Sequence, residues 1–364
     1  MTKSGKIKLL AAMSGGVDSS VAAALCVEAG YEVCGVTLRL KPEIPGSASY
    51  GNCGGLDDEA SAAQAAEVIG IPHAVIDLRH DFTEFVLSPC WCEYSHARTP
   101  NPCALCNRFV KFGKILEYAS SVGAAGMITG HYVKKIVLPD GQFALERGSD
   151  PVKDQTYFLF TLTRKDIAAS FFPLGGMSKS DVREKAESMG IHAAKKPESQ
   201  DACFSTPGEC FAETLRKFFG ASGGHGNFVD SSGKILGRHN GIHNFTIGQR
   251  KGLGVALGRP AYVSHIDEAS GSVTLCVDES ELLSNEAVVT GINYQIDGYE
   301  SHEFECSVQI RYRSAPVKAR VIPLGNSSVR VVFESPLRAV TPGQAAVFYN
   351  GNTVIGGGWM ASPQ

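Results

Sequence analysis

The chain has 364 residues, of which 43% are hydrophobic and 20% charged, and its formal net charge is −3. This composition is ordinary for a globular enzyme and allows two or three domains. No run approaches the roughly 18 apolar residues that span a bilayer, and the first residues do not resemble a signal peptide. The net charge does not indicate a nucleic-acid partner, which would have to be bound through local basic patches.

The first 130 residues alternate between strand-like and helix-like segments. Strands are predicted at 6–13, 32–40, 73–77 and 125–129, and helices at 17–29, 56–69 and 107–121. This alternation predicts an α/β domain in which helices cover both faces of a parallel sheet. A ligand of such a sheet binds beyond the carboxyl ends of its strands.

The remainder of the chain changes character. Residues 134–147 read as a hairpin around Pro139-Asp140-Gly141, and 180–189 as a short helix. Glycine becomes frequent after Pro207, and helical periodicity is lost after about Glu286. Strands are predicted at 307–322, 328–333 and 345–350, so the tail is expected to be a small all-β barrel or sandwich.

The clearest motif is a glycine-containing loop, Ser14-Gly15-Gly16-Val17-Asp18-Ser19-Ser20, between the first strand and the first helix. Glycines let the backbone approach an anion, and the helix N-terminus adds partial positive charge. A plain turn would need only two glycines and a serine. The loop lacks the lysine of a Walker A motif and resembles the PP-loop of N-type ATP pyrophosphatases, which adenylate a carbonyl oxygen.

That resemblance implies that pyrophosphate binds on the loop and that Asp18 helps to hold Mg²⁺. The residues expected to bind ATP are Ala12, Met13, Ser14, Gly15, Gly16, Val17, Asp18, Ser19, Leu38 and Gly130.

The eleven cysteines are an odd number in a chain without a secretion signal, which favours a reducing, cytoplasmic compartment. Cys106 follows two prolines, and Asn107 is expected to cap the next helix, where a thiol pKa is lowered. Cys203 lies in a second polar loop. The alternative for any cysteine is a small buried hydrophobe. We expect this alternative for Cys26, Cys34, Cys276 and Cys306, and it stays open for Cys53, Cys90, Cys92 and Cys210.

Several motifs in one order resemble the tRNA-specific 2-thiouridylases of the MnmA/TrmU type. They are the PP-loop, Gly130-His131-Tyr132, Lys153-Asp154-Gln155, Asp201-Ala202-Cys203-Phe204, the run 248–254, Arg311-Tyr312-Arg313 and Thr341-Pro342-Gly343-Gln344. The resemblance implies a PP-loop catalytic domain over 1–207, a central tRNA-binding domain over 208–283 and a C-terminal tRNA-binding β-barrel over 284–364.

The family's catalytic cysteines match Cys106 and Cys203. The resemblance implies a persulfide on Cys203, with Cys106 as the partner thiol in a transient disulfide. Many members have Asp at the position of Cys103, and this departure creates a C-x-x-C with Cys106. Three thiolates from Cys103, Cys106 and Cys203 are also the ligands that a [4Fe-4S] cluster uses. The persulfide and cluster routes both stay open.

The family's tRNA contacts match ten positions here. They are Asn101, Pro102, Cys103, His131, Lys153, Asp154, Gln155, Arg311, Tyr312 and Gln344. The segment 101–103 is expected beside the target base, which must be flipped out to reach a nucleotide in a pocket. Arg311-Tyr312-Arg313 alternates cation and aromatic, a pattern that suits phosphate contact and base stacking. Basic pairs elsewhere, such as Lys134-Lys135, are more often solvated surface.

The expected activity is ATP-dependent 2-thiolation of the wobble uridine of tRNA, with sulfur supplied by a cysteine desulfurase or a sulfur-relay carrier. One alternative is a PP-loop ligase or amidotransferase that adenylates a small metabolite. Another is a nucleotide-binding redox sensor whose cysteines act as a switch. Neither alternative predicts that tRNA stimulates ATP cleavage.

Overall fold

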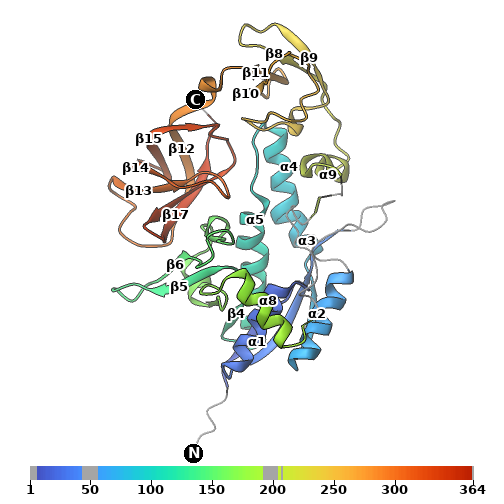
Figure 1. Ribbon diagram of the computed structural model, residues 1–364, viewed down its shortest axis with the longest axis vertical. Helices are drawn as coiled ribbons and strands as arrows, with labels where there is room; N and C mark the ends of the chain where they lie inside the picture. The colour runs from blue at the N-terminus through green and yellow to red at the C-terminus, as the bar shows by residue number, and fades with distance from the viewer. Residues whose placement is uncertain (1–5, 43–55, 192–203, 206–207, 363–364) are drawn as a thin grey trace, which may run out of the picture. The chain divides into compact units, whose positions relative to one another are not determined.

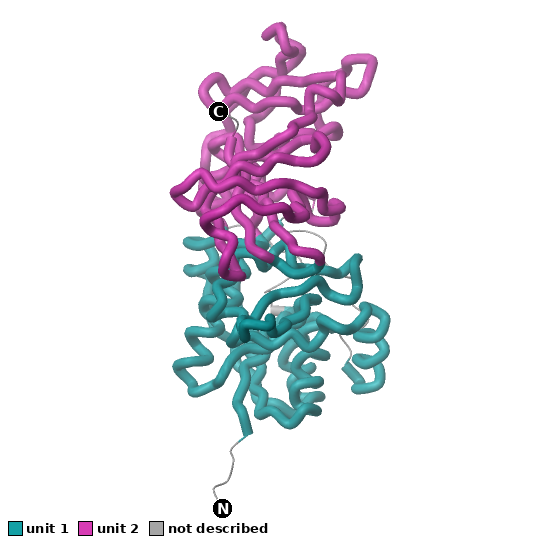
Figure 2. The backbone as a smooth tube through the Cα atoms, turned by 90° about the vertical axis from the view of Figure 1, so that its left-hand side faces the viewer, with its two compact units in different colours: residues 1–86, 103–207, 352–354 teal, residues 87–102, 208–351, 355–364 magenta. Residues whose placement is uncertain are grey.

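The computed structural model describes residues 6–42, 56–191, 204–205 and 208–362. The chain forms two compact units (Figure 2). Unit 1 consists of 1–86, 103–207 and 352–354, and unit 2 of 87–102, 208–351 and 355–364. Both units are discontinuous in sequence because the segment 87–102 packs with the C-terminal half of the chain. None of the described helices is long and apolar enough to cross a membrane.

Unit 1 is built on a parallel sheet with the strand order β3-β2-β1-β4-β7. Its strands have the blue to green colours of the first half of the chain in Figure 1. The strands are β1 (Lys8–Ala12), β2 (Glu32–Arg39), β3 (His73–Asp77), β4 (Gly126–Ile128) and β7 (Ser170–Phe171). The predicted α/β domain with a parallel sheet is therefore confirmed. The chain runs outward from β1 to β3 and then returns to β4 on the other side of β1. Such a reversal of strand order is where open α/β sheets bind ligands.

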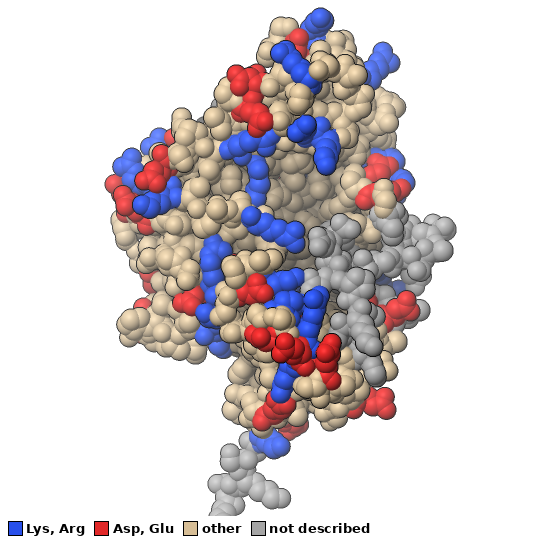
Figure 3. Space-filling view, in the orientation of Figure 1, with Lys and Arg blue, Asp and Glu red and all other residues tan. Residues whose placement is uncertain are grey.

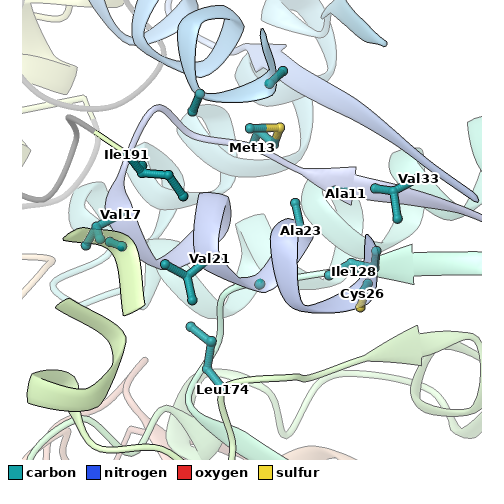
Figure 4. Close-up of a cluster of buried hydrophobic side chains, with 14 of the residues drawn as sticks. Ala11, Met13, Val17, Val21, Ala23, Cys26, Val33, Ile128, Leu174 and Ile191 are labelled. Atoms are coloured by element: carbon teal, nitrogen blue, oxygen red, sulfur yellow. The ribbon is translucent and has the colours of Figure 1, made fainter. Parts of the chain in front are cut away.

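Helices α1 (Val17–Glu28), α2 (Leu56–Ile69) and α6 (Ile115–Ser121) pack against this sheet. Helix α8 (Lys179–Ser188) packs against α1. The main core of unit 1 lies around α1, whose Val21 and Ala23 are fully buried together with Ile128 and Leu174 (Figure 4). Small residues on α1 let the sheet and α8 approach it closely. The packed core fixes the start of α1, and with it the glycine-containing loop.

The helix that carries Cys106 begins earlier than expected. Asn107 was predicted to cap it, but the helical run starts at Pro102 and continues through α5 (Pro102–Leu105), the π-helical η2 (Cys106–Lys114) and α6. Proline is favoured in the first helical turn because its φ is already helical and its missing N–H is not needed there. Asn107 instead donates from Nδ2 to the Phe158 carbonyl at 3.1 Å.

The rest of unit 1 connects these elements. It contains α3 (Arg79–Phe82), η1 (Thr83–Leu87), the predicted hairpin β5 (Val133–Val137) and β6 (Phe143–Arg147), η3 (Thr156–Phe158) and α7 (Arg164–Ala168).

Unit 2 contains a four-stranded sheet of order β10-β11-β8-β9. Its strands are β8 (Gly226–Val229), β9 (Ile235–His239), β10 (Tyr262–Asp267) and β11 (Ser272–Cys276), with a core that includes Phe228 and Val263. Helix α4 (Ser88–Ser95) packs against α9 (Phe211–Phe218), where Tyr94 and Phe211 form an edge-to-face pair. Short 3₁₀ turns lie at η5 (Ile242–Asn244) and η6 (Glu279–Leu282).

The C-terminal strands form the predicted all-β domain, as a closed barrel. Its strands are β12 (Leu283–Tyr294), β13 (Phe304–Gln309), β14 (Val317–Gly325), β15 (Ser328–Arg338), β16 (Ala345–Asn350) and β17 (Thr353–Met360). The order β12-β15-β14-β13-β16-β17 closes through pairing of β12 with β17. A Cβ atom on Gly356 would lie 2.3 Å from the Asn293 carbonyl oxygen, so glycine permits this closure. The single strand predicted over 307–322 is two strands, β13 and β14, with a turn near Arg311.

Candidate active site

A cavity of about 230 Å³ lies in unit 1 at the carboxyl ends of β1, β2 and β4. Its lining combines the glycine-containing loop, the residues after β4 and one face of the helix that carries Cys106. The lining residues are Ala12, Met13, Ser14, Asp18, Ser19, Val36, Thr37, Leu38, Leu40, Lys111, Ile115, Thr129, Gly130, His131 and Gln155. Seven of the ten predicted ATP-binding residues are among them; Gly15, Gly16 and Val17 are not. The cavity has a polar side at the loop and an apolar side at Val36, Leu38 and Leu40.

Glycine is required at two places around the loop. Gly15 has φ +75°, and a Cβ atom on it would lie 2.5 Å from the Asp58 carbonyl oxygen. A Cβ atom on Gly130 would lie 2.7 Å from the backbone nitrogen of Ser19. Gly16 is the N-cap of α1, and no side chain caps the helix there. The N-terminus of α1 therefore presents its backbone N–H groups as an anion site.

The hydroxyl groups of the loop hold its shape. Ser19 Oγ donates to the Gly16 carbonyl at 3.0 Å and accepts from the Ser14 N–H at 3.1 Å. Ser20 Oγ also donates to the Gly16 carbonyl, at 3.0 Å. These contacts tie the turn to the first turn of α1, so an anion would meet a preformed loop.

Asp18 has two partners that sequence analysis did not identify. Lys179 Nζ lies 2.7 Å from Oδ1 and 2.8 Å from Oδ2, and the Tyr132 hydroxyl donates to Oδ1 at 2.7 Å. Lys179 stands in the first turn of α8, where Ser178 and Asp181 form a capping box. The predicted 180–189 helix was visible in sequence, but nothing in its pattern connected Lys179 with residue 18.

His131 and Gln155, both predicted tRNA contacts, line the same cavity. Burial and, to a lesser extent, the nearby positive charge of Lys111 together lower the pKa of His131 to about 3. The imidazole is therefore neutral at physiological pH, with Nδ1 2.5 Å from Thr129 Oγ1. Gln155 Oε1 accepts the Tyr132 N–H at 3.0 Å, which ties this wall to the residue that contacts Asp18.

Cys103 is exposed and Cys106 is buried, three residues apart on the same helical run. The turn that carries them is held from outside the helix. Arg108 Nη1 donates to the Thr161 carbonyl at 3.0 Å, and Thr161 Oγ1 donates to the Ala104 carbonyl at 3.2 Å. Cys203 lies outside the described residues, as does Cys53. No group of three or more potential metal ligands was found among the residues that the structure describes.

The cysteines expected to be small buried hydrophobes have that character. Cys26 and Cys276 are buried, and burial raises the pKa of Cys26 to about 11. Cys306 is partly buried and its pKa is raised to about 12 by burial, while the pKa of Cys34 is raised for the same reason. Such thiols stay protonated and do not compete as nucleophiles.

Three family models match successive parts of the chain. Residues 7–207 match the model of the tRNA methyl transferase HUP domain, 212–277 the tRNA methyl transferase PRC-barrel domain and 284–360 the aminomethyltransferase beta-barrel domain. A protein of Geotalea uraniireducens named tRNA-specific 2-thiouridylase MnmA is 42% identical over 99% of this chain and 96% of its own length. The chain belongs to the tRNA-specific 2-thiouridylase family.

Two further relatives have the same name. The Geobacter metallireducens protein is 42% identical over 99% of this chain and 98% of its own length. The Carboxydothermus hydrogenoformans protein is 43% identical over 97% of each chain. The resemblance read from the motifs is thus confirmed across nearly the whole 2-thiouridylase chain.

Asp154 is buried and holds its own loop through hydrogen bonds. Its carboxylate accepts hydrogen bonds from Arg147 Nη1 at 2.7 Å, Thr156 Oγ1 at 2.8 Å and the Gly148 N–H at 3.1 Å. Lys153, next to it, is half-buried. The arrangement makes Asp154 a brace for the segment 153–156, and the tRNA contacts expected there stay predictions.

The side chains of Arg311 and Gln344, both in unit 2, also donate hydrogen bonds to backbone carbonyls. Arg311 Nη2 donates to the carbonyls of Arg338 and Ala339. Gln344 Nε2 donates to the carbonyls of Thr99 and Pro100 at 3.1 and 2.9 Å, just before the predicted base-contact residues Asn101 and Pro102. Tyr312 is half-buried. Figure 3 shows both Lys/Arg and Asp/Glu side chains on one face of the molecule, and a net charge of −3 summed over the whole chain does not report on such local groups.

Proposed function

We propose that this chain is an ATP-dependent sulfurtransferase that replaces the C2 oxygen of the wobble uridine of tRNA with sulfur. The observation that carries the proposal is the match to 2-thiouridylases over nearly the whole chain, together with a cavity lined by Ser14, Asp18 and Ser19 of the loop. The proposed domain roles are catalysis in 1–207 and tRNA binding in 208–283 and 284–364. The cytoplasm is the proposed compartment, and a cysteine desulfurase or sulfur-relay carrier the proposed donor.

The reaction has two steps. The oxygen on C2 attacks the α-phosphate of ATP, an oxygen–phosphorus bond forms, and pyrophosphate leaves with the bonding electrons. Sulfur then attacks C2, and AMP departs with the former carbonyl oxygen. Adenylation makes that oxygen a good leaving group, so the enzyme mainly aligns reactants and offsets phosphate charge.

The roles of the cavity residues follow from their chemistry. The N-terminus of α1 and the loop Ser14–Ser19 would hold the pyrophosphate portion. The Asp18 carboxylate is a hard oxygen donor whose side chain is 32% exposed, which fits a Mg²⁺ ligand. Bound Mg²⁺ would neutralise charge on the phosphates. Leu38 and Gly130 would contact the nucleoside portion.

Two routes for the sulfur remain within this proposal. In the first, the terminal sulfur of a Cys203 persulfide attacks C2. Cys106 then attacks Cys203 Sγ, which releases the thiolated base and leaves a Cys106–Cys203 disulfide for a thiol reductant. In the second, Cys103, Cys106 and Cys203 would ligate a [4Fe-4S] cluster, and that cluster would supply sulfide. The spacing of Cys103 and Cys106 fits two ligands of one centre, and the third cysteine lies outside the described residues.

The activity is tested by pyrophosphate release with and without tRNA, with 2-thiouridine measured by mass spectrometry. The proposal expects release that depends on tRNA and thiouridine only when a sulfur donor is present. Release without tRNA would favour a metabolite-adenylating ligase or amidotransferase. Nucleotide binding without turnover would favour a redox sensor.

The sulfur route is tested by anaerobic reconstitution of wild type and the Cys103→Ser, Cys106→Ser and Cys203→Ser variants. Iron content and thiouridine are measured side by side. The cluster route expects each variant to lose both together. The persulfide route expects Cys103→Ser to remain active. It also expects Cys103→Asp to be active, because the resemblance implies Asp at this position in many family members. Full activity of iron-free wild type with a persulfide donor would exclude the cluster.

A further inference from the structure

Lys111 supplies a positive charge to the cavity that the loop motif lacks. Among the described residues that line the cavity, the other ionisable side chains are Asp18 and His131, and Lys111 is the only Lys or Arg. Lys111 comes from η2, far in sequence from the Ser14–Ser19 loop. A phosphate site without a Walker A lysine therefore has a lysine from another helix.

The position of Lys111 is supported by its neighbour. Its charge is one of the two causes that lower the pKa of His131, after burial, so the ammonium and the imidazole are close. Phe112, the next residue, has its ring centroid 5.7 Å from that of His131. The wall formed by Lys111 and His131 thus carries one cation and one neutral ring.

We infer that Lys111 is a catalytic residue of the adenylation step, whose ammonium contacts the α-phosphate of ATP. This inference rests on the proposed function. The loop and the α1 N-terminus are suited to pyrophosphate, and the apolar side at Val36, Leu38 and Leu40 is suited to the nucleoside. The α-phosphate joins these two portions in ATP, and Lys111 is the remaining charged group among the described lining residues.

The chemistry explains what the cation does there. As the C2 oxygen bonds to the α-phosphorus and the bond to the bridging oxygen breaks, negative charge is spread over the α-phosphate oxygens and the leaving pyrophosphate. A fixed ammonium stabilises that charge and keeps its own proton throughout. Asp18 lies on the loop side of the cavity and cannot supply this positive charge.

The π-helical form of η2 also relates Lys111 to Cys106. Hydrogen bonds from i to i+5 bring residues five apart to successive turns on nearly the same side of the helix, whereas an α-helix does this for residues three or four apart. Cys106 and Lys111 are five apart within η2. The segment therefore turns the cation toward the same side as the thiol proposed for sulfur transfer.

The test separates the phosphates by using three probes: adenosine, AMP and pyrophosphate, each titrated calorimetrically into the full-length protein. Lys111→Met is expected to weaken AMP binding by about tenfold or more, because a charge-assisted hydrogen bond is lost. Adenosine and pyrophosphate should bind as to wild type. Single-turnover pyrophosphate release with tRNA should fall by about 10²–10³-fold.

Lys114→Met is the matched control, since Lys114 lies on the same helical segment, is not among the described lining residues, and pairs with Asp81 at 3.1 Å and Glu117 at 3.3 Å. It should leave all three affinities unchanged, and Lys111→Arg should retain most of the AMP affinity. Unchanged AMP affinity in folded Lys111→Met would overturn the inference. If Lys111→Met and Lys111→Gln both fail to fold, Lys111 is a packing residue and the inference also fails. If wild type binds none of the probes, the proposed nucleotide site itself is wrong.

Discussion

Lys179 holds both carboxylate oxygens of Asp18, at 2.7 and 2.8 Å, across 161 residues of sequence. The lysine side chain is only 10% exposed, whereas the aspartate side chain is 32% exposed. Asp18 therefore has a structural role as the counter-ion of a buried ammonium, besides its proposed role toward Mg²⁺. The two roles predict different results for different substitutions.

Asp18→Ala should abolish ATP cleavage and also lower the free energy of unfolding by on the order of 1–3 kcal/mol, because it leaves Lys179 without its carboxylate. Asp18→Asn should abolish cleavage with a smaller loss, since an amide oxygen can still accept from Lys179. Urea unfolding and pyrophosphate release measure the two effects. Glu28→Ala is the control, because it removes the partner of the more exposed Lys185 on α8 and should cost less than about 1 kcal/mol. Equal stability of all three variants would contradict the counter-ion role.

Arg311→Ala should destabilise the protein by about 1–2 kcal/mol, because two backbone carbonyls lose their donor. If Arg311 also contacts a tRNA phosphate, the salt dependence of tRNA binding should fall by about one counterion. Arg313→Ala is the control for stability, since Arg313 is exposed. A destabilised Arg311 variant with an unchanged salt slope would leave Arg311 as a packing residue alone.

Gln344→Glu should loosen the segment before Asn101, since a carboxylate would face the carbonyl oxygens that Gln344 Nε2 now satisfies. Hydrogen exchange over residues 96–101 should become faster. Glu334→Gln, at an exposed position of β15, should not change it. Unchanged exchange in the Gln344 variant would show that other contacts, such as the Thr99 N–H to the Pro342 carbonyl, hold the segment sufficiently.

Acid should destabilise the protein through His131. Its folded pKa is about 3, below the unfolded value of about 6.5, so the unfolded chain binds more protons between these values. The stabilisation is complete above about pH 6.5 and decreases as the pH falls toward 3, by at most about 1.4 kcal/mol per pH unit. Urea unfolding at pH 7 and pH 5 should show a larger loss for wild type than for His131→Asn. Equal losses would place His131 in contact with solvent.

Local patterns made much of unit 1 predictable. The Ser14–Ser20 loop, its flanking strand and helix, and helix α2 were visible from hydrophobic periodicity and glycine placement. The sequence pattern predicts the start of the Cys106 helix five residues late, because Asn107 is typical of a helix cap while Pro102 already begins the helix. The Arg311 region was read as one long strand because alternating apolar residues continue on both sides of a turn.

The roles of residues that the fold brings to the cavity or to Asp18 could not be predicted from local sequence patterns. Lys179 and Lys111 stand in ordinary helical patterns, where a lysine is usually a solvated side chain. Their meaning depends on which strands and helices become neighbours, and the spacing along the chain does not contain that information. Asp154, chosen by resemblance as a tRNA contact, shows the converse: the motif located the loop, while the structure gives the side chain internal partners.

The segment 87–102 belongs to unit 2 although the ribosome makes it before most of unit 1. Helix α4 is synthesised more than a hundred residues before α9. The Thr99 carbonyl is synthesised still longer before Gln344, the residue that donates a hydrogen bond to it. Until then a nascent chain carries Trp91 and Tyr94 without the His243 and Phe211 rings that later pack against them. A nascent chain stalled before residue 208 would thus present an aromatic surface to chaperones, even when the parallel sheet of unit 1 has already folded.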